Sequence, residues 1–203
     1  MTPWPQLRFG RVLQPGTLVN LVVRFSIIYF LGEVLLFPED PRFAGKAIPI
    51  RNLVIVLSFG MLFPLMYALR WHGQGRSYPA WLDSLYLSIF WLDMAGNSFN
   101  LYDSYYYFDL IPHFHGPGAL AAALAGAFKL SPLGAIGITN TVHTLLEGQE
   151  YYTDLFAATH NVRGVGDTVN DLLAGLVGAF CYIGVYVLLT RGKRSGEKAI
   201  GSS

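Results

Sequence analysis

The sequence predicts an all-α integral membrane protein, a polytopic helical bundle with about six transmembrane helices. Hydrophobic residues make up 53% of its 203 residues and charged residues only 13%, whereas soluble domains average about 25% charged residues. Six apolar stretches are long enough to cross about 30 Å of hydrocarbon at about 1.5 Å per residue. No internal repeat or long linker divides the chain, so we expect one membrane domain over residues 1–203.

The predicted spans follow the apolar runs between turn-forming residues. The first is opened by "QPG" and closed by "PEDP"; it is longer than the apolar core of a signal peptide and carries Arg24 and Glu33, so we expect it to be retained. In the fourth and sixth, "ALAAALAGAF" and "GLVGAF" are typical of small-residue faces on which membrane helices pack. The six expected spans are residues 17–37, 52–70, 81–101, 110–128, 132–156 and 165–190.

The positions of lysine and arginine predict the orientation of these spans. Nine basic residues fall on the side that holds both termini and four on the other side, while Arg24 lies inside the first span. Because basic residues favour the cytoplasmic face, we expect a multi-pass membrane protein with both termini cytoplasmic. Loops 38–51, 102–109 and 157–164 then face outward.

The charge balance excludes one class of partner. A net charge of +1, with basic residues scattered near segment ends, gives no surface for nucleic acid. The single Cys181 lies in an apolar run, cannot form an internal disulfide and is expected to act as a small apolar residue. Membrane lipids, and other membrane subunits, are the partners that this composition favours.

Polar and ionisable residues gather near the outer end of four predicted spans. They are Asp93, Asn97 and Asn100 in the third span, Asp109, His113 and His115 in the fourth, His143 and Glu147 in the fifth, and Asp167, Asn170 and Asp171 in the sixth. Helix rise places His115, Glu147, Asn97 and Asp171 about 8–13 Å below the outer edge. A carboxylate in the middle of a membrane helix costs about 2.5–3.5 kcal/mol. We therefore expect these groups to point inward, around an outward-opening polar cavity.

The start of the fourth span contains helix-breaking residues. Pro112 and the Gly-Pro-Gly at 116–118 predict an irregular turn there. On a regular helix His113 and His115 would point about 200° apart. An irregular turn would let both histidines face one site.

Several of these residues also have purely structural interpretations. Asp109 is alternatively the N-cap of the fourth helix, and Asp167 a first-turn acid favoured by the helix dipole. His143 is alternatively a hydrogen-bonded core histidine, and Asp83 an interfacial residue near its helix end. Arg24 and Glu33 are expected to form a paired or snorkelling structural set. The whole cluster is alternatively a polar network that only holds the helices together.

The residue types define which chemistry the cluster can perform. No phosphate-binding loop, nucleophile elbow or H-E-x-x-H motif is present. His113, His115, Glu147, Asp167 and Asp171 form a plausible ligand set for zinc or manganese. Without a metal, Glu147, Asp171 and His113 can relay protons or act as acid and base. Asn97 and Asn100 are placed to contact a polar head group, and Asp167 and Asp109 to orient the histidines.

Three segments in the second half of the chain resemble the signatures of a known family. They are "DLIPHFHGPGALAAAL", "HTLLEGQEYY" and "GVGDTVNDLLAGLVGA", and they are similar to those of the YjdF-like bacterial inner-membrane proteins. The matching positions are Asp109, His113 and Phe114, then Glu147, then Asp167, Thr168, Asp171, Gly178 and Ala179. The order His, Glu, Asp is more distantly similar to VanZ-like proteins. His115 and Pro117 are not part of the family pattern. The resemblance implies a multi-span protein of the bacterial cytoplasmic (inner) membrane with a functional cluster and no established activity.

Three functional hypotheses follow from these observations. The leading one is a membrane-embedded enzyme that acts on a lipid or amphiphile with the help of a metal. The second is a non-catalytic subunit of a larger membrane complex, in which the histidines ligate a haem or pigment or lock the helices. The third is a small ion-coupled transporter that uses Asp93 and Glu147 as carriers, which the lack of evident inverted repeats disfavours.

Overall fold

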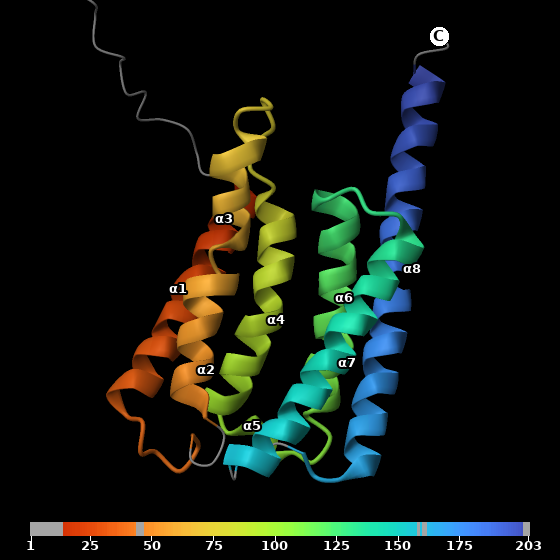
Figure 1. The fold of residues 1–203 in the computed structure, drawn as a ribbon. Helices are drawn as coiled ribbons and strands as arrows, with labels where there is room; N and C mark the ends of the chain where they lie inside the picture. The colour runs from red at the N-terminus through yellow and green to blue at the C-terminus, as the bar shows by residue number, and fades with distance from the viewer. Residues whose placement is uncertain (1–13, 44–46, 158, 160–161, 201–203) are drawn as a thin grey trace, which may run out of the picture.

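The structure is a computed structural model that describes residues 14–43, 47–157, 159 and 162–200. Every regular element among these residues is a helix, as predicted. The long helices, which stand side by side, are α1 (Pro15–Leu36), α4 (Ala80–Ser98), α6 (Leu110–Ala127), α7 (Pro132–Ala157) and α8 (Val165–Ile200). Of these, α1, α4 and α7 run in one direction and α6 and α8 in the other (Figure 1). The shorter helices are α2 (Ile48–Val54), η1 (Ile55–Phe59), α3 (Leu62–Met66), η2 (Tyr67–Trp71) and α5 (Leu101–Ser104).

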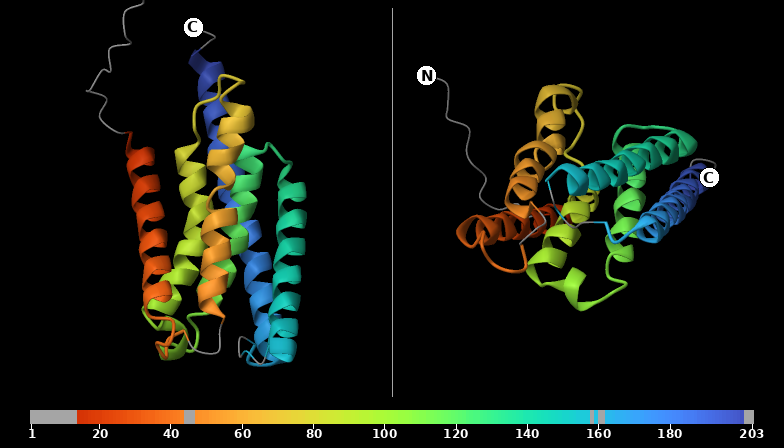
Figure 2. Two further views of the ribbon diagram at one scale, coloured as in Figure 1. Left: turned by 60° about the vertical axis from the view of Figure 1, so that its left-hand side comes forward. Right: turned by 60° about the horizontal axis from the view of Figure 1, so that its bottom comes forward.

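Three helical stretches are long and apolar enough to cross a membrane. They are Pro15–Leu36, Ile48–Trp71 and Val165–Arg191. The other predicted spans correspond to α4, α6 and α7, which lie alongside the first three (Figure 2) and are long enough but less hydropathic. These helices carry Asp93, His113 and Glu147. The polar residues of the predicted site therefore lower the mean hydropathy of the helices that hold them. The six-span arrangement therefore stays a prediction.

The outer faces of the bundle are apolar. Phe25 and Tyr29 on α1 are 69% and 67% exposed, and Leu188 and Leu189 on α8 are 71% and 66% exposed. Soluble monomers rarely expose contiguous apolar surface on this scale. Burial in lipid explains how so much apolar surface can remain uncovered by protein.

The expected irregular turn at the start of the fourth span is not present. Instead, α6 is helical from Leu110 to Ala127 with Pro117 inside it. Pro112 falls in the first turn, where its missing N–H would have no partner within the helix. Pro117 removes one further bond, and α8 packs directly against that turn, since a Cβ on Gly175 would lie 3.0 Å from the Pro117 ring.

The irregular helix is the second predicted span. It contains two π-helical turns, η1 and η2. They are closed by bonds from Gly60 N to the Ile55 carbonyl (2.8 Å) and from His72 N to the Tyr67 carbonyl (2.9 Å).

Two close helix pairs organise the bundle, and α6–α8 is one of them. A Cβ on Gly178 would lie 1.9 Å from the Phe114 carbonyl oxygen, and one on Gly118 would lie 2.5 Å from the Tyr182 ring. Only glycine at these positions allows the two backbones to approach so closely. Ala121 and Ala125 of "ALAAALAGAF" lie in one buried cluster with Ala179 of "GLVGAF", so the predicted small-residue faces contribute to the contact between α6 and α8.

The second close pair, α1–α4, is held by a buried ion pair. Arg24 donates to Asp83 at 2.6 Å, and Asp83 also accepts from Asn20 at 2.8 Å and from the Tyr78 hydroxyl. The Asp83 side chain is fully buried against α1 in the first turn of α4. Its charge is therefore satisfied inside the bundle, and an interfacial depth for Asp83 stays a prediction. Glu33 is also paired, with Arg42 at 2.9 Å.

The first residue of α1 and the last of α8 lie at the same end of the bundle (Figure 1). The segments between α1 and α2, α4 and α6, and α7 and α8 lie at the other end. Which end faces the cytoplasm stays a prediction. Of the basic residues that support it, Arg8, Arg11 and Lys46 lie outside the described residues.

Candidate metal centre

Two helices place three ligand-type side chains against one another. His113 lies in the first turn of α6, while His143 and Glu147 lie one turn apart on the same face of α7. Gly175 of α8 makes room for them, since a Cβ there would lie 2.2 Å from Nδ1 of His143. The glycine of α8 thus allows the His143 ring to enter the helix interface.

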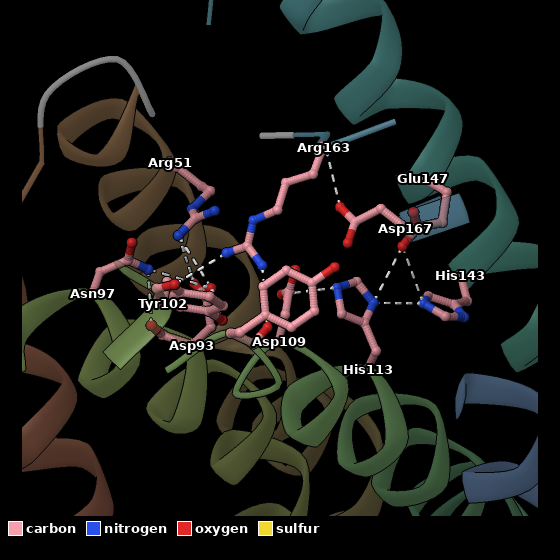
Figure 3. Close-up of polar contacts among 11 residues, drawn as sticks. Arg51, Asp93, Asn97, Tyr102, Asp109, His113, His143, Glu147, Arg163 and Asp167 are labelled. Atoms are coloured by element: carbon pink, nitrogen blue, oxygen red, sulfur yellow. Dashed lines mark hydrogen bonds and ion pairs between the residues drawn. The ribbon is translucent and has the colours of Figure 1, made fainter. Parts of the chain in front are cut away.

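The three side chains form a tight triangle, which we call the His–His–Glu triangle (Figure 3). Nδ1 of His113 lies 3.0 Å from Nε2 of His143 and 3.2 Å from Oε1 of Glu147. The third side, from His143 Nε2 to Glu147 Oε1, is 3.3 Å. The His143 and Glu147 side chains are 7% and 5% exposed and that of His113 is 18% exposed.

Hydrogen bonds alone cannot account for all three atom–atom contacts of this triangle at once. Each of the two ring nitrogens carries at most one hydrogen, which points in one direction. If both nitrogens donate to Glu147, the 3.0 Å contact between them is a contact of two donors. A cation at the centre accepts all three lone pairs. With bonds of about 2.0–2.1 Å, neighbouring ligands of a tetrahedral zinc are about 3.4 Å apart, close to the spacing found here.

Asp109 contacts the other nitrogen of the His113 ring. Its Oδ1 lies 3.4 Å from Nε2 of His113, and its side chain is 16% exposed. Asp109 occupies the N-cap position of α6, as the structural interpretation expected, but its side chain forms no capping hydrogen bond and approaches His113 instead. A carboxylate on the far nitrogen fixes the ring and its tautomer, as it does for most metal-binding histidines.

Asp171 of α8 is the third carboxylate near His113. One oxygen of Asp171, one of Asp109 and a nitrogen of His113 all lie within 4.8 Å of one another. Asp171 is 4% exposed. It forms no hydrogen bond or close ion pair with the residues that the structure describes.

His115 lies outside this cluster. Because α6 is a regular helix here, its ring points away from that of His113, which corrects the expectation that both face one site. Nε2 of His115 lies 2.8 Å from the Ser88 hydroxyl, and Nδ1 lies 2.7 Å from the Tyr182 hydroxyl. His115 thus connects α4, α6 and α8.

Asp167 also has a partner elsewhere. Its Oδ2 accepts a hydrogen bond from the backbone N–H of Arg163 at 3.0 Å (Figure 3). It is therefore a first-turn residue of α8 that fixes the preceding loop. The structure does not bring Asp167 to the histidines, which it was expected to orient.

Asn97 belongs to a second polar group, centred on Asp93. Arg51 of α2 forms an ion pair with Asp93 at 2.9 Å, and the Tyr102 hydroxyl donates to Asp93 at 3.0 Å. Asn97 is 3% exposed and donates to the Asp93 carbonyl. Asn100 has a left-handed backbone (φ 54°) at the start of α5. Contact of either asparagine with a head group stays a prediction.

Arg163 lies between the two polar groups in Figure 3. Its guanidinium donates to the carbonyls of Tyr102 and Tyr106 at 3.0 and 3.2 Å. The loop between α7 and α8 is thereby tied to the segment between α4 and α6.

Two cavities lie away from the cluster. One of about 490 Å³ is lined by Glu33, Asp40 and Arg42 at the end of α1. The other, of about 340 Å³, is apolar and lies among α4, α6 and α8 beside Cys181 and Tyr182. An outward opening of the cluster itself stays a prediction.

Sequence reasoning included His143 in the polar cluster but not among the proposed metal ligands, and it gave Arg51 no place in the site. The signal for His143 was present in its spacing of four residues from Glu147 on one helix face. Arg51 lies in a predicted loop in the sequence, but α2 begins before it, at Ile48.

Comparisons with protein-family models, with curated proteins and with solved structures find no significant match to this chain. The resemblance to the YjdF-like proteins therefore stays a prediction. What the chain does has to be inferred from its own geometry.

Proposed function

We propose that this protein is a membrane-embedded, metal-dependent hydrolase that acts on a lipid or another amphiphile. The observation that supports it most is the His–His–Glu triangle, in which three ligand atoms lie 3.0–3.3 Å apart inside the bundle. Two imidazoles and one carboxylate are a ligand set of hydrolytic zinc sites, which keep a fourth position open for water or substrate.

The bound ion would supply Lewis acidity and a water of lowered pKa. The protein's own residues would perform the remaining tasks. His113, His143 and Glu147 hold the ion, and Asp109 keeps the His113 ring in place through Nε2. The low exposure of His143 and Glu147 keeps bulk water from competing for the ion.

The proposed substrate class follows from the surroundings of the site. The triangle lies between helices of a bundle with an apolar exterior, of which three stretches are able to cross a membrane. A substrate with an apolar tail can reach such a site from the bilayer, whereas a fully polar one would have to leave water. An ester or phosphoester of a lipid has the required apolar tail and a bond that water can cleave.

The geometry favours a single ion over a haem or pigment. The rings of His113 and His143 are 5.3 Å apart between centroids, and their nitrogens face each other at 3.0 Å. An axial ligand of a macrocycle needs a nitrogen that points into open space. The roles of complex subunit and of ion-coupled transporter have no comparable observation in their favour.

Zinc binding tests the proposal first. We expect purified protein in mild detergent to bind Zn²⁺, and Glu147→Gln and His143→Ala to lose most of that affinity in competition with a chromogenic chelator. His115→Ala is the matched control, because it removes an imidazole from the same helix as His113 but outside the triangle. Equal affinity in all four proteins, or no binding in any, would refute the metal site.

Hydrolysis is tested separately. Zinc-loaded protein in vesicles of mixed phospholipids is expected to release fatty acid or a phosphorylated head group, detected by mass spectrometry. The Glu147→Gln variant should release none, and His115→Ala should act like the wild type. Zinc binding without any lipid product would leave a metal site and rule out the hydrolase on these lipids.

A further inference from the structure

The carboxylate of Asp171 lacks a close hydrogen-bond or ion-pair partner among the described residues of the cluster. It is 4% exposed and forms no hydrogen bond or close ion pair with the described residues. A buried carboxylate without partners is costly, and proteins normally pair it or use it to bind a metal. Asp171 lies with Asp109 and His113, whose ligand atoms are within 4.8 Å of its own.

An ion bound in the His–His–Glu triangle would not be the missing partner of the Asp171 carboxylate. That ion would lie on the Nδ1 side of the His113 ring, toward His143 and Glu147. Asp109 approaches the Nε2 side of the same ring at 3.4 Å. Three carboxylates, of Glu147, Asp109 and Asp171, thus surround His113, and two of them belong to a group that the triangle does not include.

We propose that a second divalent cation binds between Asp109, Asp171 and Nε2 of His113, so that the His113 ring bridges two ions. This inference rests on the proposed function, because it assumes the first ion in the triangle. When the second ion binds, the Nε2 hydrogen of His113 leaves to solvent as a proton, and the ring becomes an imidazolate. The ion gains one N–metal bond and neutralises the two aspartates.

The donor set indicates which ion this position prefers. Two carboxylates and one imidazole are harder ligands than the two imidazoles and one carboxylate of the triangle. A cation that prefers oxygen ligands and keeps water among them, such as Mn²⁺, suits this donor set better than zinc does.

Manganese stoichiometry tests the second position. Purified wild-type protein is incubated with MnCl₂, freed of loose ions by gel filtration and measured by elemental mass spectrometry. We expect two manganese ions per chain in the wild type and one in Asp171→Asn. Asp167→Asn is the matched control, because it makes the same change one turn earlier on α8, and it should keep two.

The outcomes separate the two proposals. One ion per chain in the wild type that Asp171→Asn keeps, or two ions in Asp171→Asn, would overturn the second position and leave the triangle standing. No bound manganese in the wild type would also overturn the second position, whereas the zinc competition with Glu147→Gln and His143→Ala decides the triangle separately. An electron paramagnetic resonance spectrum of the manganese-loaded wild type needs no variant: we expect an exchange-coupled pair, and an isolated six-line Mn²⁺ signal alone would overturn the bridge.

Discussion

The buried ion pair between α1 and α4 predicts a large effect of one conservative substitution. Asp83→Asn keeps the shape of the side chain but removes its charge. It leaves the Arg24 guanidinium, 2.6 Å away, without a carboxylate. The hydrogen bonds from Asn20 and Tyr78 to the same carboxylate are weakened as well.

The size of the effect follows from the burial of the two side chains. Removing one partner of a buried ion pair costs about 3–5 kcal/mol. The Asp83 side chain is fully buried, but that of Arg24 is 22% exposed and can recover part of its solvation. We therefore expect about 3 kcal/mol, which for a chain of this length lowers Tm by about 6–12 °C.

Thermal unfolding in detergent, followed by intrinsic tryptophan fluorescence, measures this change. Glu39→Gln is the control, because it removes one carboxylate from an exposed position at the end of α1. The double variant Arg24→Gln/Asp83→Asn should lie closer to the wild type than the two single changes added together predict. A Tm for Asp83→Asn within 2 °C of that for Glu39→Gln, on the scale of about 2–4 °C per kcal/mol, would show that the pair does not hold α1 to α4.

Three further predictions concern the site, the packing and the membrane. Asp109→Asn should weaken zinc binding about 10–100-fold, as loss of a carboxylate behind a metal-binding histidine does; chelator competition measures it, and wild-type affinity would show that Asp109 does not support His113. Gly178→Ala should destabilise the bundle by about 1–3 kcal/mol or more, because its Cβ would meet the Phe114 carbonyl at 1.9 Å, whereas Gly184→Ala, with open space around it, should not; equal Tm values would contradict the close α6–α8 contact. Cys181, exposed in the part of α8 that is long and apolar enough to cross a membrane, should react in intact membranes with a lipid-soluble maleimide and not with a charged one; rapid labelling by the charged reagent would contradict a lipid-facing position.

Spacing on regular helices was the most dependable guide to the site. His143 and Glu147 are four residues apart and do face the same neighbour. Asp109, His113, Glu147 and Asp171 converge from three helices, as their predicted depths suggested. These inferences needed only helix geometry and the free-energy cost of placing a charge in a membrane. Both depend mainly on residues that are close together in the sequence.

The errors arose where helix-breaking residues were read without their tertiary neighbours. Pro117 was expected to break the fourth span, yet α8 packs against that turn and α6 stays helical. As a result His115 faces Ser88 and Tyr182 instead of His113. The sequence also did not reveal that Arg24 pairs with Asp83, because that contact joins α1 to α4 across 59 residues.

The His–His–Glu triangle is tested most directly by X-ray absorption spectroscopy of protein loaded with one equivalent of zinc. We expect two imidazole rings and one carboxylate oxygen per zinc, with bonds of about 2.0–2.1 Å. Zinc surrounded by oxygen alone, without scattering from imidazole, would place the ion elsewhere and contradict a metal centre at His113, His143 and Glu147.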